Sequence, residues 1–219
     1  MIAAIVFDMD GVIVNTEQVW DEVREGLVAD WSGRYSAEAQ RAMMGMSSGE
    51  WSLYMHDELG LAESPTEINE EVVRRLLARY RDDLPLVDGA VAAVRELAGS
   101  FPLAVASSSN RPLIDVVLAT AGIAACFAAT VSSEEVARGK PSPDVYLEAA
   151  HRLGVAPGLC AAVEDSANGI RAATEAGMHV IAYPNRHYPP DAEALALAHT
   201  VIDSLAELGE AVGAPREQG

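Results

Sequence analysis

The sequence predicts an α/β protein in which a parallel β-sheet core carries an inserted all-helical domain. Short apolar runs alternate with stretches of helical periodicity along most of the chain. Such alternation is typical of parallel strands joined by helical crossovers. Residues 15–85, which follow the first apolar run, show helical patterns only, and this break in the alternation indicates the insertion.

The strands are expected where apolar runs are short and continuous, because a parallel strand covered on both faces is apolar throughout. The clear candidates are residues 2–7, 103–107 and 160–164, and the weaker ones are 129–133, 179–183 and 200–203. Helices are expected between these strands, at residues 89–99, 112–122, 142–154 and 166–177. Glycines at the ends of these segments support their bounds.

The predicted insertion divides the chain into two parts. Residues 1–14 and 86–219 are expected to form the α/β core, and residues 15–85 the helical domain. The helical domain is expected to contain four helices, at residues 16–31, 36–43, 48–60 and 66–83. Glycine, serine and proline between these segments mark the expected turns.

Composition restricts the partners. The 219 residues include 15 basic and 33 acidic side chains, which gives a formal net charge of −18. Nucleic acids and anionic membranes are therefore poor partners, because both are bound through cationic patches. An anionic small-molecule substrate would need a local positive spot within this acidic protein.

The first apolar run stops at Asp8, which makes it too short for a signal peptide or a membrane span. Cys126 and Cys160 have no CxxC spacing and are expected to be buried thiols of a reducing compartment. We therefore expect a cytoplasmic protein, and a monomer as the default for its size.

Polar side chains follow four of the expected strands or crossovers. They are Asp8 and Asp10, the serines that begin at Ser107, Lys140, and the pair Glu164 and Asp165. In open α/β sheets, ligands bind beyond the carboxyl ends of the strands. Each group taken singly could be an ordinary helix cap, turn residue or loop charge. Together they place several carboxylates at one sheet edge, where they repel each other unless a cation lies among them.

This combination predicts a magnesium site for phosphoryl chemistry. Oxygen ligands favour Mg²⁺, which usually also binds a substrate phosphate. A carboxylate beside the metal can attack phosphorus, while a lysine and a serine hydroxyl stabilise the phosphoryl oxygens. Lys140 is the one lysine in the chain, beside fourteen arginines. A compact ammonium differs from a planar guanidinium, so this position is expected to require lysine.

Four segments resemble the motifs of the haloacid dehalogenase superfamily, in the right order. They read "DMDGVIVNTE", "VASSSN", "GKPSPDVY" and "VEDSANGIRAATEAGM". The resemblance covers the whole chain and is closest to the β-phosphoglucomutase-like phosphatases. It implies a Rossmann-like three-layer core with an all-helical cap domain, to which the insertion corresponds.

The resemblance also implies roles for individual residues. Asp8 matches the nucleophile, and Asp10 matches the general acid that later acts as a base on water. The implied phosphate-binding residues are Ser107, Ser108 and Lys140. The implied magnesium ligands are Asp8, the backbone carbonyl of Asp10, Asp165 and, as an additional carboxylate, Glu164.

Several related activities are weighed against hydrolysis. Dehalogenases of the superfamily lack an aspartate at the position of Asp10, and its transport ATPases have a lysine where Met9 stands. The subgroup's mutases use a histidine where this chain has Trp20, and an arginine in the loop that reads "GMSSGEW" here. We expect a phosphatase that acts on a small phosphorylated metabolite such as a sugar phosphate. A phosphosugar mutase and a catalytically idle binding protein remain the alternatives.

The cap is expected to contact the leaving group of the substrate. Its candidate contacts are Thr16, Trp20, Gly45, Met46, Ser47, Trp51 and Arg75. The ordinary interpretation of the tryptophans and Met46 is that they pack in the interior of the cap. Arg75 has an ordinary interpretation too, as one of several arginines on a solvated helix face.

Overall fold

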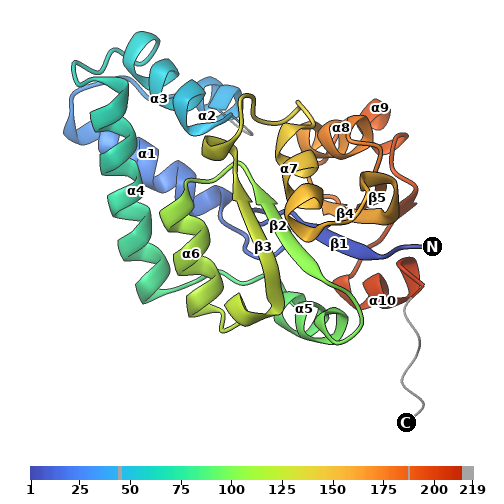
Figure 1. The fold of residues 1–219 in the computed structure, drawn as a ribbon. Coiled ribbons are helices and arrows are strands. Elements are labelled where there is room, and N and C mark those ends of the chain that lie inside the picture. The colour runs from blue at the N-terminus through green and yellow to red at the C-terminus, as the bar shows by residue number, and fades with distance from the viewer. Residues whose placement is uncertain (44–45, 187, 214–219) are drawn as a thin grey trace.

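The computed structural model describes residues 1–43, 46–186 and 188–213 (Figure 1). Its described strands form one parallel sheet in the order β3-β2-β1-β4-β5-β6. The strands are β1 (Ala4–Phe7), β2 (Leu103–Ser107), β3 (Phe127–Ser132), β4 (Cys160–Glu164), β5 (His179–Ala182) and β6 (Thr200–Val201). This order is that of doubly wound folds and confirms the predicted parallel-sheet core.

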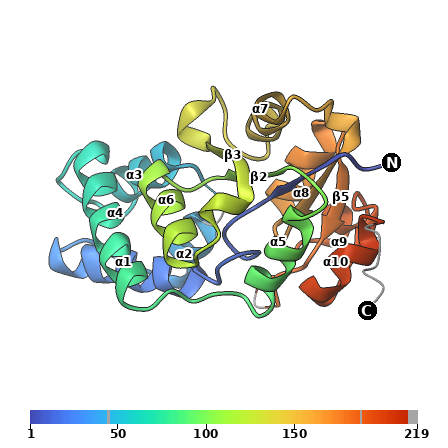
Figure 2. The ribbon, with the colours of Figure 1, turned by 60° about the horizontal axis from the view of Figure 1, so that its bottom comes forward.

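Helices cover both faces of the sheet, so that the core has three layers (Figures 1 and 2). Alternate residues of β1 point to opposite faces: Ile5 packs with helices α5 and α6, whereas Val6 packs with α7 and α8. The helices of the core are α5 (Ala90–Ala98), α6 (Arg111–Thr120), α7 (Asp144–Leu153), α8 (Ala167–Glu175), α9 (Ala192–Leu195) and α10 (Leu208–Ala211). The central strands β1, β2 and β4 are buried on both faces and are apolar up to their last residues, whereas the edge strands β3 and β6 are partly exposed.

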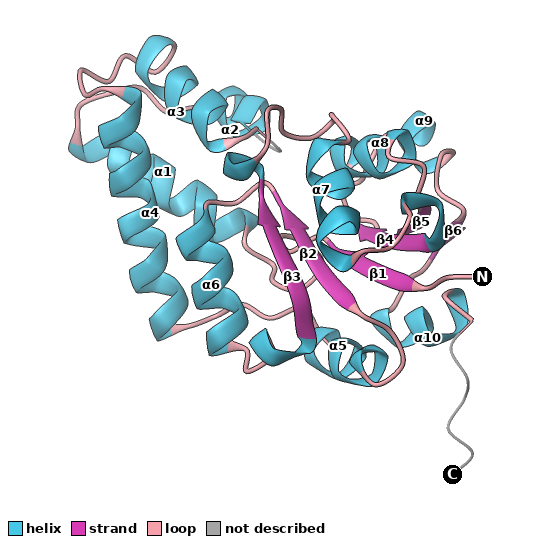
Figure 3. Cartoon of the chain, in the orientation of Figure 1, coloured by secondary structure: helices cyan, strands magenta, loops and turns pink. Residues whose placement is uncertain are grey.

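The predicted helical insertion forms a separate group of helices at one end of the sheet (Figure 3). It contains α1 (Glu17–Asp30), α2 (Ala37–Met43), α3 (Ser48–Asp57) and α4 (Pro65–Asp82). Helix α4 begins with a capping box between Ser64 and Glu67, as the Ser-Pro turn of the sequence indicates. Its buried residues Val72 and Leu76 belong to an apolar cluster that continues into the core.

Two neighbouring chain segments connect the helical insertion to the core. The backbone amide of Asn15 donates to the carbonyl of Pro85 at 2.7 Å, and that of Val87 donates to Ile13 at 3.0 Å. The entering and leaving segments therefore lie side by side, directly after β1. This pairing holds the insertion over the edge of the sheet at which β1 ends.

The elements that the sequence analysis did not predict are all short. They are α9, α10 and the 3₁₀ turns η1 (Ala124–Cys126), η2 (Ser133–Glu135), η3 (Pro157–Leu159) and η4 (Leu205–Glu207). A helix of one turn shows no hydrophobic periodicity, which explains why these elements escape sequence analysis. Within the described residues, each predicted strand is present, and the predicted strand ends differ from the observed ones by at most two residues. Within the described ranges, no helix combines the length and the apolar character needed to cross a membrane.

Replacing Leu76 by alanine tests the packing of the helical insertion. Leu76 is fully buried in α4, and we expect Leu76→Ala to lower the free energy of unfolding by about 2–5 kcal/mol. Leu53 in α3 is 49% exposed, and Leu53→Ala should change it by no more than about 0.5 kcal/mol. Urea denaturation followed by circular dichroism measures both, and equal losses would show that α4 does not anchor the insertion.

Candidate active site

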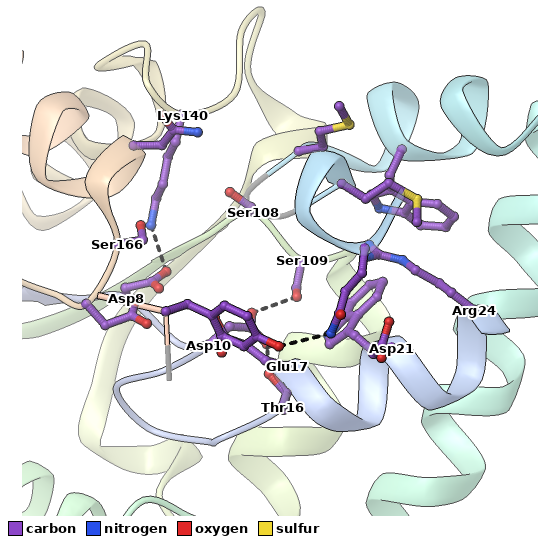
Figure 4. Close-up of a pocket in the computed structure, with 18 residues that line it drawn as sticks. Asp8, Asp10, Thr16, Glu17, Asp21, Arg24, Ser108, Ser109, Lys140 and Ser166 are labelled. Atoms are coloured by element: carbon purple, nitrogen blue, oxygen red, sulfur yellow. Dashed lines mark hydrogen bonds and ion pairs between the residues drawn. The ribbon is translucent and has the colours of Figure 1, made fainter. Parts of the chain in front are cut away.

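The predicted polar residues meet where β1, β2 and β4 end. Asp8 directly follows β1, and its backbone amide donates to the carbonyl of Val163 in β4 at 2.9 Å. Glu164 and Ser107 are the last residues of β4 and β2, the two strands that pair with β1. Parallel strands end at the same edge of a sheet, so side chains far apart in the sequence become neighbours. Figure 4 shows Asp8 and Lys140 close together on one side of a pocket.

Lys140 joins two of these carboxylates. Its Nζ donates to Asp8 Oδ1 at 2.7 Å and to Glu164 Oε1 at 2.6 Å, and the residue is only 7% exposed. Its Nζ also lies 5.0 Å from the ring centre of Tyr146, whose hydroxyl donates to Glu164 Oε1 at 2.7 Å. The ammonium is therefore fixed beside Asp8 by contacts on several sides.

Glu164 holds this arrangement in place. Besides Lys140 and Tyr146, its carboxylate accepts hydrogen bonds from the backbone amides of Asp165 and Ser166 and from the Ser166 hydroxyl, at 3.0–3.1 Å. It is completely buried. These contacts fit a carboxylate that positions Lys140, and its proposed role as a metal ligand stays a prediction.

Asp10 lies within a group of hydroxyls. Its carboxylate accepts hydrogen bonds from Thr16 at 2.5 Å, Ser109 at 2.8 Å and Ser107 at 3.3 Å. Thr16 is the residue before α1, Ser107 is the last residue of β2, and Ser109 follows that strand. Three donors from two different segments therefore fix the direction of this carboxylate.

The serines after β2 have different surroundings. Ser107 is fully buried, and its oxygen accepts a hydrogen bond from the backbone amide of Ser109 at 3.0 Å. Ser108 and Ser109 line the pocket, and Ser107 does not. Of the two serines predicted to bind phosphate, Ser108 is thus the one that lines the pocket. Ser107 is buried and forms hydrogen bonds with Ser109 and Asp10. The contribution of Ser109 was not predicted, although it belongs to the same serine triplet.

Two glycines leave space for two carboxylates. A Cβ on Gly11 would lie 1.9 Å from Oδ2 of Asp165, and the φ of Gly11 is +85°, which disfavours other residues. A Cβ on Gly169, in the first turn of α8, would lie 1.7 Å from Oε1 of Glu164. Each carboxylate therefore occupies space that is free only because the neighbouring residue is glycine.

The charges of the buried carboxylates are poorly compensated by the protein alone. Burial raises the pKa of Asp8 to about 8, against the opposing effect of Lys140. Burial and the charges of Glu164 and Asp8 likewise raise the pKa of Asp165 well above its usual range. Burial alone would lower the pKa of Lys140, but the charges of Asp8 and Glu164 raise it above its usual range. Lys140 is therefore charged at physiological pH, and a further cation would favour the ionised forms of Asp8 and Asp165.

This donor set suits a hard divalent cation. Asp8, Glu164 and Asp165 offer carboxylate oxygens that lie within 4.8 Å of one another. Oxygen ligands with no nitrogen or sulfur are those of Mg²⁺ rather than of zinc. Asp8 and Asp165 would hold the ion, because both oxygens of Glu164 already accept hydrogen bonds. The residues present thus fit the predicted Mg²⁺.

The pocket lies between the core and the helical insertion. It has a free volume of about 140 Å³ and is bounded by Asp8, Asp10 and Lys140 from the core and by Trp20 and other side chains from the insertion. Gln40 of α2 donates to the hydroxyl of Tyr188 at 3.0 Å, which connects the two parts across the pocket.

The structure separates the predicted cap contacts into two groups. Thr16, Trp20, Met46 and Trp51 line the pocket. Ser47 instead caps α3 through Glu50, and Gly45 lies outside the described residues. Arg75, which the sequence analysis expected at the substrate, is not part of the pocket lining, and its guanidinium is instead bound to Asp30 and Glu71.

A different arginine, Arg24 of α1, lies in the pocket and was not predicted. A signal for it exists in the sequence. Trp20 and Arg24 are four residues apart in one helix, and such residues share a face. The helix α1 begins soon after Asp10, so the face that it turns toward the site carries both Trp20 and Arg24. The other pocket residues that were not predicted are Glu17, Asp21, Gln40, Met43, Ser109, Ser166, Asn168 and Tyr188.

Comparison with known proteins identifies the family. A sequence model of the haloacid dehalogenase-like hydrolases matches residues 2–177. The chain belongs to this family. The resemblance seen in the four sequence motifs is thereby confirmed, and the chain is an enzyme of the hydrolase class.

Individual relatives of this family member are phosphatases. YqaB, a fructose-1-phosphate phosphatase of Escherichia coli K12, is 32% identical over 82% of this chain and 95% of its own length. A bifunctional riboflavin kinase/FMN phosphatase of Arabidopsis thaliana is 30% identical over 94% of this chain, which spans only 54% of that relative. The crystal structure of CbbY from Rhodobacter sphaeroides in complex with phosphate has 28% identity and a TM-score of 0.85, covering 95% of this chain and 97% of that one.

Replacing Gly169 by alanine tests whether the position of Glu164 depends on the absence of a side chain at residue 169. We expect Gly169→Ala to displace Glu164 and with it Lys140, and displacement of a working group by about 1 Å costs about 10²-fold in rate. Gly49→Ala in α3 is the matched control, because a Cβ there would meet no atom within 4 Å. The measurement is phosphate release from p-nitrophenyl phosphate. Near-normal activity of Gly169→Ala would contradict the role given to Glu164.

Proposed function

We propose that this protein is a Mg²⁺-dependent phosphatase that hydrolyses a small phosphorylated metabolite through an aspartyl-phosphate on Asp8. The observation that carries the proposal is the contact of Lys140 with Asp8 at 2.7 Å, at the buried meeting point of three strand ends. A lysine fixed beside a carboxylate can stabilise the oxygens of a phosphoryl group that the carboxylate attacks. Magnesium, held by Asp8 and Asp165, would neutralise the charge of the phosphoryl group and of its carboxylate neighbours.

In the proposed first step, an oxygen of Asp8 forms a bond to phosphorus while the ester P–O bond breaks. Asp10 gives a proton to the leaving oxygen, so that an alcohol departs. In the second step water attacks phosphorus, its proton passes to Asp10, and the bond to Asp8 breaks to release phosphate. The hydroxyls of Thr16, Ser107 and Ser109 fix the direction of Asp10 for both proton transfers.

Hydrolysis rather than mutase chemistry is favoured by the side chain at position 20. Trp20 lines the pocket and packs against the ring of Trp51, with 5.8 Å between ring centres. An indole cannot take up or release a proton in catalysis, unlike the histidine of the mutases. Nothing at this position would therefore help to pass the phosphoryl group to a second substrate hydroxyl.

The pocket supports a small substrate. Its free volume is about 140 Å³, below the range of roughly 300–1,000 Å³ that is typical of drug-sized ligands. Relatives named for fructose 1-phosphate and FMN differ greatly in the size of their substrates. We infer that the helical insertion acts as a cap domain and that its pocket-lining residues select the leaving group.

A panel of phosphorylated metabolites tests the proposal. We expect phosphate release from at least one member, with a strong dependence on Mg²⁺ and a loss of at least about 10³-fold in Asp8→Asn, because the nucleophile is removed. Phosphate is measured colorimetrically, and sugar phosphates are also analysed by NMR for isomers. Release that is unaffected by Asp8→Asn would contradict the mechanism, and isomer formed faster than phosphate would favour the mutase.

Lys140→Arg tests why this position holds lysine. The ammonium fits between Asp8 and Glu164, whereas a guanidinium is larger and prefers a planar fork of hydrogen bonds. We expect the variant to remain folded and to lose about 10²-fold or more in kcat. Arg138→Lys, at an exposed ion pair with Asp144, is the matched control and should retain normal activity. Equal kcat for Lys140→Arg and the wild type would show that charge alone suffices.

A further inference from the structure

Arg24 is a buried cation that projects into the pocket from the helical insertion. The residue is only 8% exposed, and its guanidinium carbon lies 4.6 Å from the ring centre of Trp20 and 5.1 Å from that of Trp51. Figure 4 shows Arg24 across the pocket from Asp8 and Lys140. The two positive side chains of the pocket thus come from different parts of the molecule.

Arg24 lacks the partner that a buried arginine normally has. Among the residues that the structure describes, no carboxylate forms an ion pair with it, and its buried Nε has no hydrogen-bond partner. Asp21 also lies in the pocket, but one of its oxygens accepts a hydrogen bond from Tyr35 at 2.5 Å. Other arginines of the insertion are paired: Arg75 binds Asp30 and Glu71, and Arg79 binds Glu22.

An unpaired buried guanidinium is costly, because its charge and its N–H groups leave water without replacement. Burial is the main cause that lowers the pKa of Arg24 to about 10, so the group is still charged near neutral pH. Stacking on Trp20 and Trp51 offsets part of the cost. Arg24 also lines the pocket, so its guanidinium can take a planar anion as a partner there.

We propose that Arg24 binds a second anionic group, a carboxylate or a second phosphate, on the leaving group of the substrate. The inference rests on the proposed phosphatase function and specifies its substrate class. The phosphoryl group to be removed lies at Asp8 and Lys140, and the second anion supplies the missing partner of Arg24. Because the pocket is small, the two anionic groups are separated by a short carbon chain.

Three esters of similar length test this assignment: glycerol 3-phosphate, 3-phosphoglycerate and glycerol 1,3-bisphosphate. They differ in whether the far end carries a hydroxyl, a carboxylate or a second phosphate. We expect the wild type to favour one or both of the anionic esters over glycerol 3-phosphate by about 10-fold or more in kcat/KM. The better of the two anionic esters identifies the second group. Equal kcat/KM for all three would overturn the proposal.

Two variants separate recognition from support of the fold. Arg24→Met should raise KM for the preferred anionic ester by about 10-fold or more beyond any rise that it causes with glycerol 3-phosphate. Arg24→Lys should recover part of the preference, because it restores the charge without the fork. Arg79→Met, which breaks an exposed ion pair of the same helical insertion, should leave the preference unchanged. Equal losses with all esters in Arg24→Met would show a structural role and would also overturn the proposal.

A binding measurement keeps this test independent of turnover. Asp8→Asn and the double variant Asp8→Asn/Arg24→Met are titrated with the three esters by calorimetry in the presence of Mg²⁺. Tighter binding of the anionic esters that disappears with Arg24→Met supports the proposal even if none of the three esters is hydrolysed. The phosphatase function is refuted separately, if no member of the metabolite panel is hydrolysed. Hydrolysis without any anion preference in rate or binding would refute the role of Arg24 alone.

Discussion

The contact of Lys140 with Asp8 and Glu164 is the interaction on which the rest of the site depends. Several buried carboxylates gather at one edge of the sheet, and they are tolerated only if positive charge and hydrogen bonds compensate for the lost water. Lys140 supplies that charge to Asp8, and Glu164 fixes Lys140. Glu164 is held in turn by Tyr146 and Ser166 and lies in the space that Gly169 leaves free. One ion-pair network therefore links three motifs that are distant in the sequence.

The sheet order explains why these motifs can meet. The strand β1 lies between β2 and β4, so residues that follow these strands project from neighbouring positions at the same edge. The chain enters the helical insertion directly after β1 and returns to the core before α5. It thereby brings α1, with Trp20 and Arg24, over the group that surrounds Asp8. The core thus supplies the reacting groups, and the insertion supplies the surroundings of the leaving group.

Sequence analysis predicts the sheet and the core of the site well, because both depend on local patterns. Apolar runs mark β1 and β4, and the polar residues after them form recognisable motifs. It fails where a role depends on distant partners. Arg75 and Arg24 are both arginines in helices of the insertion, and the sequence does not distinguish their roles. Only the structure shows that Arg75 is bound by Asp30 and Glu71, whereas Arg24 lies against two indole rings. The burial of Ser107 beneath Ser109 is equally invisible in a serine triplet.

The contacts between the helical insertion and the core also affect the length of the ligand that the pocket can hold. Asn15 is bound to Pro85 and Val87 to Ile13, and the apolar cluster of α4 also continues into the core. Gln40 adds a hydrogen bond to Tyr188, so the helical part is fixed to the sheet at several places. These contacts set the separation between the guanidinium of Arg24 in the helical part and the ammonium of Lys140 in the core. The length of a molecule that can touch both cations is therefore determined by packing outside the pocket.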